Sequence, residues 1–414
     1  MICERPSDPA EIPQDSPSLR TDKNWEDVCM KYNRISADCH MDLCNLPPDL
    51  FVSEASEAFK ARVPHVVDAE DGRRWFDGDG IGYGLVNGCS GGGAPYVPGA
   101  HHRIDRMAET GLYDDGKKGI RRVSDPYLRL KEMEMDGVDA EVIFGPLSLM
   151  LQMRDPALIR ESLYIYNTWL AQDFCKPFPD RQLGLGCVPL NDIDYAVKEI
   201  HRVAELGLAG IELPHSPDMV PLWHPQWEPI WQAISDVDLP MHFHTFPSVP
   251  TGIPAFDPEH RPARLFTMVS TFQVNLFPIV AGIISSGALE RYPNLRVAFG
   301  ESGIGWLPYA MDRMDFEWDD QFKFGAMGQR LKMKPSEYLL RQCRFSFQYE
   351  KIGAKLVDLI GVETLMWGSD FPHGDGVWPD SSAIIEDQFA HLPAETTRKI
   401  VCDNAVEFYR LENA

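Results

Sequence analysis

The sequence has no long apolar run, no paired cysteines and no N-terminal targeting pattern. It contains no stretch of about eighteen consecutive apolar residues, so a membrane-spanning helix is not expected. Its start, Met1–Pro6, lacks the charged and then apolar pattern of a signal peptide. The nine cysteines are scattered and include no Cys-x-x-Cys pair, which is typical of reduced thiols and not of disulfides or a structural zinc site. We therefore expect a cytoplasmic protein without a membrane partner.

Positive charge is also scarce. Lysine and arginine number 39 against 62 aspartates and glutamates, which gives a net charge of -23 over 414 residues. This excess of negative charge argues against nucleic acid and anionic membranes as partners. No Gly-x-Gly-x-x-Gly run follows an early strand, which disfavours a dinucleotide-binding sheet. We therefore expect the partner to be a small-molecule substrate.

What the sequence does contain is an alternation of short apolar runs and helical patterns, most regular from about residue 125. Strands are predicted at residues 35–43, 138–144, 183–190, 210–213, 239–244, 295–300, 343–347 and 364–367, and helices at 125–135, 156–174, 193–206, 223–237 and 264–287. Strands that alternate with helices at this spacing predict parallel βαβ units. The leading architecture is a distorted (β/α)8 TIM barrel, with an open doubly wound sheet as the alternative.

Two segments fall outside this alternation. Residues 1–34 are rich in Pro, Asp and Ser and predict an N-terminal arm without a core of its own. The barrel is expected to span residues 35–411, with a long insertion after the first strand at about 45–118. A loop of this length is usually functional or part of an interface. Together with the arm, it indicates a homo- or hetero-oligomer.

Several predicted strands end in carboxylates and histidines. In an α/β barrel the carboxyl ends of the strands direct side chains into the catalytic mouth. For Asp370 alone, a turn or N-cap role before a proline is an equally good interpretation. The same pattern nevertheless recurs along the chain: Asp38-x-His40-x-Asp42 on the first strand, Glu212 on the fourth, His242-x-His244 on the fifth, Glu301 after the sixth, and Asp370 with His373 after the eighth.

Taken together, these residues predict a metal site. Alternate residues of a strand face the same side, so Asp38, His40 and Asp42 can converge in the barrel lumen. A single histidine on a strand is more often a satisfied core residue. Many carboxylates and imidazoles buried at one mouth, however, would each cost several kcal/mol without a counter-charge. A divalent cation removes that cost.

The runs that carry this pattern resemble the amidohydrolase superfamily, and specifically its amidohydrolase-related branch, which includes aminocarboxymuconate-semialdehyde and resorcylate decarboxylases. The resemblance covers most of the chain from about residue 35 to 411. It rests on Asp38-x-His40-x-Asp42, on Leu-Pro-Met-His-Phe-His at 239–244, on Glu-Ser-Gly-Ile-Gly-Trp-Leu-Pro at 301–308 and on Gly-Ser-Asp-Phe-Pro-His at 368–373. It implies a distorted barrel with a catalytic divalent metal.

Carried over by position, the resemblance implies that Asp38, His40, His244 and Asp370 hold a first metal ion. Asp42 stands where the family has a second first-strand histidine, and Glu301 where it has a sixth-strand histidine that helps to polarise substrate or water. Both departures add negative charge, and oxygen ligands mixed with imidazole favour one or two ions of Fe or Mn, with Zn as the alternative. The expected metal residues are Asp38, His40, Asp42, His242, His244, Glu301 and Asp370; the expected catalytic residues are Asp370, Glu301 and His244; the expected substrate contacts are Glu212 and His373.

Three functions are compatible with these residues. Some members of the superfamily are oxygenases with a dinuclear iron or manganese–iron centre, and hydroxylation of 2-aminoisobutyric acid by a two-subunit member is one example. The acidic set of ligands favours this interpretation, so the leading expectation is O2-dependent hydroxylation of a small carboxylate-bearing substrate. The first alternative is metal-dependent hydrolysis or non-oxidative decarboxylation. The second is a non-catalytic barrel subunit that supports a partner.

Overall fold

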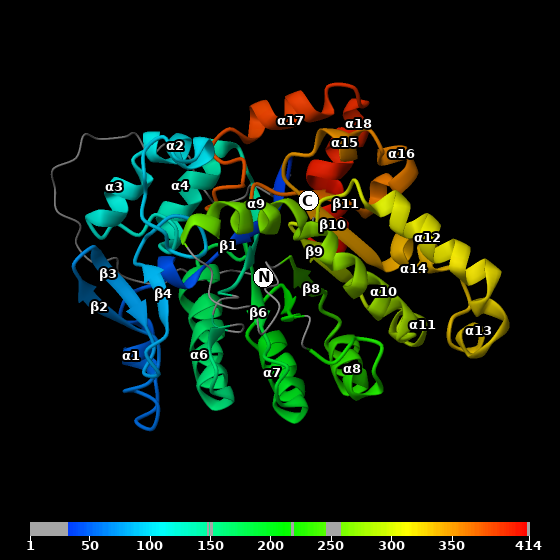
Figure 1. Cartoon of the computed structure of the whole chain (residues 1–414), viewed down its shortest axis with the longest axis horizontal. Helices are drawn as coiled ribbons and strands as arrows, with labels where there is room; N and C mark the ends of the chain where they lie inside the picture. The colour runs from blue at the N-terminus through cyan, green and yellow to red at the C-terminus, as the bar shows by residue number, and fades with distance from the viewer. Residues whose placement is uncertain (1–31, 147–148, 150–151, 217–218, 246–257, 412–414) are drawn as a thin grey trace, which may run out of the picture. The chain divides into compact units, whose positions relative to one another are not determined.

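Eight parallel strands form a nearly closed barrel in the computed structural model (Figure 1), which describes residues 32–146, 149, 152–216, 219–245 and 258–411. Around the sheet their order is β1 (Ile35–His40), β5 (Ala140–Phe144), β6 (Gln182–Cys187), β7 (Gly210–Glu212), β8 (Met241–His244), β9 (Val297–Gly300), β10 (Cys343–Phe347) and β11 (Leu365–Trp367). The first and last strands meet where the His40 N–H donates to the Phe371 carbonyl and the Asp370 N–H donates to the Asp38 carbonyl, both at 2.8 Å. The predicted (β/α)8 barrel is confirmed, and all eight predicted strands are present.

The barrel strands are buried along their length, because helices cover them outside and side chains fill the lumen. Val142, Phe144, Leu183 and Leu185 form one buried cluster in β5 and β6. A buried ion pair adds to this frame. The Arg129 guanidinium lies 2.8 Å from Glu141 and also donates to the carbonyls of His40 and Phe371, at 3.3 and 3.4 Å. Arg129 therefore holds the ends of β1 and β11 together beside the candidate site.

The helices between the strands follow the predicted pattern. The described helices of the barrel include α4 (Pro126–Asp136), α6 (Pro156–Trp169), α7 (Ile193–Glu205), α8 (Glu228–Val237), α10 (Phe277–Ser285), α12 (Leu307–Asp320), α14 (Pro335–Gln342), α17 (Ser381–Phe389) and α19 (Asn404–Tyr409). Asp125 and Asp155 cap α4 and α6, each accepting backbone N–H bonds in front of a proline at the first helical position. The sequence analysis does not predict the four later helices α12, α14, α17 and α19.

The predicted helical stretch at 264–287 is divided in the structure. It forms α9 (Arg261–Thr271), the short 3-10 helix η5 (Gln273–Leu276) and α10. Among the described residues no single helix is long and apolar enough to cross a membrane. Residues 262–271 and 273–285 reach that length and composition only as a pair, bent by 48°.

Between β1 and β5 the chain builds a small region of its own, where the sequence indicated a long loop. It contains α1 (Leu50–Glu54), a three-stranded antiparallel sheet, α2 (His102–Glu109) and α3 (Leu112–Lys117). The sheet is made of β2 (His65–Ala69), β3 (Gly72–Phe76) and β4 (Gly82–Leu85), and Figure 1 shows it beside the barrel. The glycine-rich loop after β4 reaches the barrel mouth, where Ser90 Oγ accepts the Gly374 N–H at 3.1 Å. Of the predicted N-terminal arm, residues 1–31 lie outside the described part of the chain.

Candidate metal centre

Four side chains converge at the carboxyl end of the barrel. Asp38 and His40 come from β1, His244 from β8, and Asp370 from the turn after β11. Asp38 Oδ1 lies 3.3 Å from His40 Nε2 and 3.4 Å from His244 Nε2, and Asp370 Oδ1 lies 3.0 Å from His40 Nε2. All four residues are buried. We call this set, Asp38, His40, His244 and Asp370, the four-residue cluster.

Among the described residues, the atoms that face one another in this cluster have no hydrogen-bond partner. They are Asp38 Oδ1, His40 Nε2, His244 Nε2 and both carboxylate oxygens of Asp370. The Nδ1 of His244 lies 2.7 Å from the Thr245 carbonyl, to which it donates, so Nε2 is the ring nitrogen that faces Asp38. Two buried carboxylates that face each other in this way need a positive charge between them. Burial alone would lower the pKa of His40, but Asp370 and Asp38 raise it to about 9, and a bound cation would supply that charge in place of the proton.

The donor set therefore fits a divalent metal ion. Ligand atoms of Asp38, His40 and His244 all lie within 4.8 Å of one another. Imidazole nitrogens mixed with carboxylate oxygens are a usual set of ligands for Mn, Fe or Zn. The structure brings together the four residues that the resemblance assigned to a first metal ion.

Asp38 is oriented by its second oxygen. Its Oδ2 accepts from the Glu301 N–H at 2.5 Å, from the Ser346 hydroxyl at 2.8 Å and from the Gln348 amide at 3.4 Å. Such contacts fix a ligand carboxylate and leave its other oxygen free for the metal. The sequence analysis missed Ser346 and Gln348, although their i, i+2 spacing at the end of β10 is the same signal that identified the other strand ends.

A second group of ionisable side chains adjoins the four-residue cluster. His373 lies between two carboxylates, with Nε2 at 2.7 Å from Asp42 Oδ2 and Nδ1 at 3.1 Å from Asp370 Oδ1. Its ring stacks on that of His40 with the centroids 3.9 Å apart. Two sets of atoms here have the spacing to hold a cation, His40–Asp42–His373 and Glu301–Asp370–His373. The predicted residues Asp42, Glu301 and His373 are thus brought to the same mouth.

Burial and mutual charge set the protonation of this second group. Burial alone would lower the pKa of His373, but Asp370 and Asp42 raise it well above its usual range. Burial would raise the pKa of Asp42 and Asp370, and their histidine neighbours lower it. Burial raises the pKa of Glu301 well above its ordinary value, and the carboxylates of Asp375 and Asp370 raise it further. Glu301 is therefore held as a neutral carboxylic acid beside Asp375, which the sequence analysis did not single out.

Two non-glycine residues at the mouth have left-handed backbones. Glu301 has φ 47° and Asp370 has φ 56°, a conformation that costs about 1–3 kcal/mol in such residues. Both turn their N–H groups to Asp38: Glu301 donates to its side chain and Asp370 to its carbonyl. The strained conformations are thus held by contacts that also position the carboxylates.

The structure does not bring His242 into the cluster. Its Nδ1 donates to the Ile211 carbonyl at 3.1 Å, and its Nε2 accepts from the Tyr409 hydroxyl at 2.8 Å. Both ring nitrogens are occupied, and burial lowers the pKa of the ring to about 3. His242 therefore has no nitrogen left for a metal, which differs from the expectation drawn from its spacing.

Glu212 lies buried at the end of β7. Its Oε2 accepts the Gly145 N–H at 2.7 Å, whereas its Oε1 has no partner in the described part of the chain. Burial raises the pKa of the carboxyl to about 7. The expectation of a substrate contact at Glu212 stays a prediction, with the free Oε1 as its candidate atom.

Residues 38–411 match the model of the amidohydrolase family Amidohydro_2, and the chain belongs to this family. Among curated relatives, the 2-amino-3-carboxymuconate-6-semialdehyde decarboxylase of Dictyostelium discoideum is 23% identical over 70% of this chain and 77% of its own. Among solved structures, an amidohydrolase of Mycobacterium avium subsp. paratuberculosis superposes with a TM-score of 0.69 at 18% identity, over 92% of this chain and 98% of that one. A dihydroxybenzoic acid decarboxylase of Polaromonas sp., solved with bound manganese and 2-nitroresorcinol, gives a TM-score of 0.58 at 20% identity, over 74% and 93%.

Family membership and the converging donor set make this chain a metal-dependent enzyme of the hydrolase or decarboxylase type that takes a divalent ion. The relatives named above support the decarboxylase alternative of the sequence analysis better than its leading hydroxylase interpretation. They also argue against a purely supporting, non-catalytic barrel.

Proposed function

We propose that the protein catalyses metal-dependent, non-oxidative decarboxylation of a small conjugated carboxylic acid. The observation that carries the proposal is the four-residue cluster, whose facing ligand atoms have no hydrogen-bond partner among the residues that the structure describes. The names of the relatives, a carboxymuconate semialdehyde decarboxylase and a dihydroxybenzoic acid decarboxylase, support the substrate class. Asp38, His40, His244 and Asp370 are the proposed ligands, Mn or Fe the proposed metal, and His242 is left out.

The bound ion would hold and polarise oxygen atoms of the substrate. In the reaction the bond from carbon to the carboxylate breaks, CO2 leaves, and the electron pair stays on the carbon, where a proton replaces CO2. We assign this proton to Glu301, because burial, and after it the neighbouring carboxylates of Asp375 and Asp370, raise the pKa of its carboxyl well above the ordinary value. The carboxylate left on Glu301 takes up a proton from water before the next turnover, which closes the proton balance. Asp370, whose pKa His373 and His40 lower against the effect of burial, stays ionised as a ligand, and His373 Nδ1 lies 3.1 Å from its Oδ1 and holds it in place.

Metal content and CO2 release test this proposal. We expect about one divalent ion per chain in protein purified without chelator. Conjugated carboxylic acids, dihydroxybenzoates included, should release CO2 without O2. Glu301→Gln should lower kcat by more than about 100-fold while the metal is retained.

Asp370→Asn should abolish turnover with the fold retained, and the exposed Asp358→Asn serves as its matched control. Absence of CO2 release from any acid in the presence of stoichiometric metal would contradict the proposal.

Hydroxylation with O2 is the second candidate, and one observation favours it. Asp42, Glu301 and His373 add two further cation-competent sets beside the four-residue cluster, enough for a second ion. In this case elemental analysis would give about two ions per chain, Fe or Mn, and substrate would drive O2 uptake without stoichiometric CO2. The two candidates thus differ in metal count, gas consumed and gas released.

A further inference from the structure

The loop that carries Asp370 and His373 is long and largely buried. It runs over residues 368–380, from the end of β11 to the start of α17, without a helix or strand of its own. Val377 and Trp378, near its far end, are both buried. A buried backbone carbonyl needs a hydrogen-bond donor, because leaving it unpaired costs about as much as a lost hydrogen bond. A loop without regular structure must obtain such donors from other parts of the chain.

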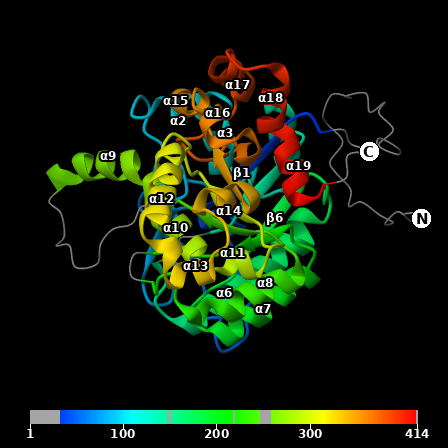
Figure 2. The same cartoon turned by 90° about the vertical axis from the view of Figure 1, so that its right-hand side faces the viewer.

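Arg103 of α2 supplies several of these donors. Its guanidinium donates to the carbonyls of three consecutive residues, to Gly376 at 3.2 Å, to Val377, and to Trp378 at 3.1 Å. Its Nη1 also pairs with Asp380 at 3.1 Å. A guanidinium presents five N–H donors in a planar fork, so one side chain can hold a backbone segment of this length. Helix α2 belongs to the insertion, and Figure 2 shows it at the same end of the molecule as α17, in agreement with Figure 1.

The segment that Arg103 holds is bonded directly to the metal centre. The Gly376 N–H donates to the His373 carbonyl at 3.2 Å, and the Val377 N–H donates at 2.9 Å to the carbonyl of the residue before Asp370. Gly376 also approaches the Asp370 backbone closely, because a Cβ on this glycine would lie 2.9 Å from the Asp370 carbonyl oxygen. Only one layer of backbone therefore separates the Arg103 guanidinium from the backbone of Asp370 and His373.

The backbone of Asp370 depends on such support. Its φ is 56°, a left-handed conformation that residues other than glycine keep only where the surrounding structure imposes it. On one side the Asp370 N–H donates to the Asp38 carbonyl at 2.8 Å. On the other side the turn is held by Gly376 and Val377, which Arg103 fixes. Release of that segment would let Asp370 relax and would move its carboxylate out of the four-residue cluster.

The insertion contacts the same loop at a second point. Ser90 Oγ accepts the Gly374 N–H at 3.1 Å. Gly91 lies against the Asp42–His373 pair, since a Cβ on it would be 3.0 Å from Asp42 Oδ1 and 3.1 Å from His373 Nε2. The insertion is therefore part of the frame of the metal centre.

We propose that Arg103 is a positioning residue of the metal centre. It holds the backbone that places the Asp370 carboxylate and the His373 ring, and so sets the affinity of the site for a divalent ion. The inference rests on the metal centre and does not depend on the proposed decarboxylation. Arg106, three residues further along α2, provides the comparison. It also pairs with Asp380, at 3.1 Å, but its described contacts include none of the three carbonyls.

The test is titration of the metal-free, full-length protein with Mn²⁺ and with Co²⁺. Arg103→Lys keeps the positive charge beside Asp380, but an ammonium has no planar fork to span three carbonyls. It should raise the dissociation constant for Mn²⁺ by about 10-fold, the lower end of the range for outer partners of metal ligands. The visible absorption of the Co²⁺-loaded protein, which reports the geometry of the ligands, should change as well.

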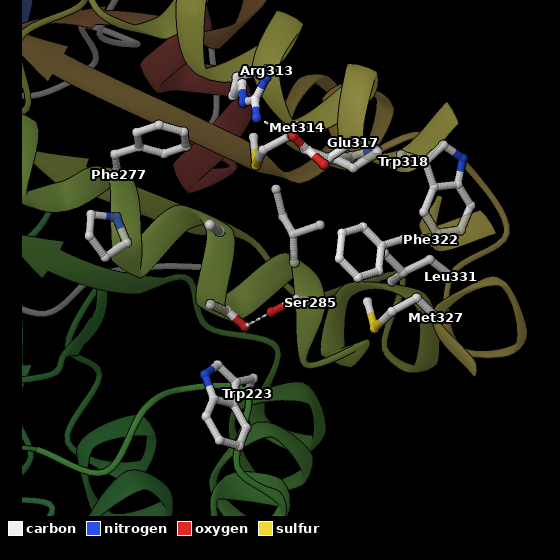
Figure 3. A pocket seen from close by; sticks show the side chains of 15 residues that line it. Trp223, Phe277, Ser285, Arg313, Met314, Glu317, Trp318, Phe322, Met327 and Leu331 are labelled. Atoms are coloured by element: carbon white, nitrogen blue, oxygen red, sulfur yellow. Dashed lines mark hydrogen bonds and ion pairs between the residues drawn. The ribbon is translucent and has the colours of Figure 1, made fainter. Parts of the chain in front are cut away.

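Two further arginines serve as controls. Arg106→Lys is the matched control, and it should leave the Mn²⁺ dissociation constant within about twofold of wild type. Arg313→Lys is the remote control. Figure 3 shows Arg313 beside Glu317 on α12, where the two pair at the edge of an apolar cavity of about 460 Å³. Urea unfolding of each metal-free variant separates a loss of metal affinity from a loss of the fold.

Two results would overturn the proposal. The first is wild-type affinity and absorption in Arg103→Lys. The second is an equal loss of affinity in a control, since Arg106→Lys would then implicate Asp380 alone and Arg313→Lys any change of an arginine. If Arg103→Lys does not fold, Ser90→Ala decides. It removes the other contact of the insertion with the loop and should raise the Mn²⁺ dissociation constant about threefold, the worth of one hydrogen bond. No change in that variant would contradict a positioning role of the insertion.

Discussion

His242 and His244 lie two residues apart on β8, and their rings contact the same Phe144, at 5.7 and 4.8 Å between centroids. Both are buried. The Nε2 of His244 faces the Asp38 carboxylate without a hydrogen bond, whereas both nitrogens of His242 are hydrogen-bonded. One ring is thus prepared for a cation and the other is a satisfied core residue. Two residues that face the same side of a strand both point into the barrel lumen. Their neighbours in the lumen then decide which of them can bind a metal ion.

The largest effect on metal binding should come from substitution of His244. His244→Ala removes one of four donors and should weaken metal binding by more than about 100-fold, since even outer partners of metal ligands are worth 10–100-fold. Elemental analysis and metal titration would measure this. If His244→Ala kept its full metal content, His244 would be no more a metal ligand than His242.

Substitution of His242 should instead lower the free energy of unfolding. His242→Ala leaves a cavity and removes the partner of the Tyr409 hydroxyl, which together should cost about 2–3 kcal/mol in the free energy of unfolding. The metal content should not change. Urea unfolding and elemental analysis on the same sample check both halves, with His391→Ala near the surface as the control histidine. Loss of metal from His242→Ala would mean that His242 is a ligand after all.

Low pH should destabilise the folded protein through His242. Burial lowers the pKa of His242 to about 3, below its ordinary value of 6.5, so between these values the unfolded chain takes up a proton that the folded protein refuses. This contribution to stability is present above pH 6.5 and is lost as the pH falls. It should amount to about 2 kcal/mol between pH 7 and pH 5. Unfolding measured at both pH values should show the dependence in wild type and a weaker one in His242→Ala.

The smallest effect concerns Glu212, which pairs in register with His242. Its folded pKa of about 7 is above the ordinary 4.5, so wild-type stability falls as the pH rises through 7. Glu212→Gln does not titrate and should gain about 1 kcal/mol relative to wild type between pH 6 and pH 8. Unfolding curves at the two pH values measure it. An unchanged difference would indicate that the free Oε1 finds a partner.

The sequence was most informative where local pattern decides. Alternating strands and helices predicted all eight barrel strands, since hydrophobic periodicity and Asp, Gly and Pro boundaries are local signals. The insertion shows the limit. Its presence after the first strand was predicted, but the pairing of β2, β3 and β4 into a sheet requires contacts that no single run of residues specifies.

The sequence by itself determined the barrel and a wider set of strand-end carboxylates and histidines, because strand-end position and period-two alternation follow from the order of residues. The resemblance to the family then selected Asp38, His40, His244 and Asp370 from that set. Only the tertiary structure decided which partner each of these side chains contacts. His242 is satisfied by Tyr409, 167 residues away, and Asp42 contacts His373 across 331 residues. Burial, together with Asp375 and Asp370, raises the pKa of Glu301. These contacts join residues that are far apart in the sequence, so the spacing of residues along the chain cannot predict them.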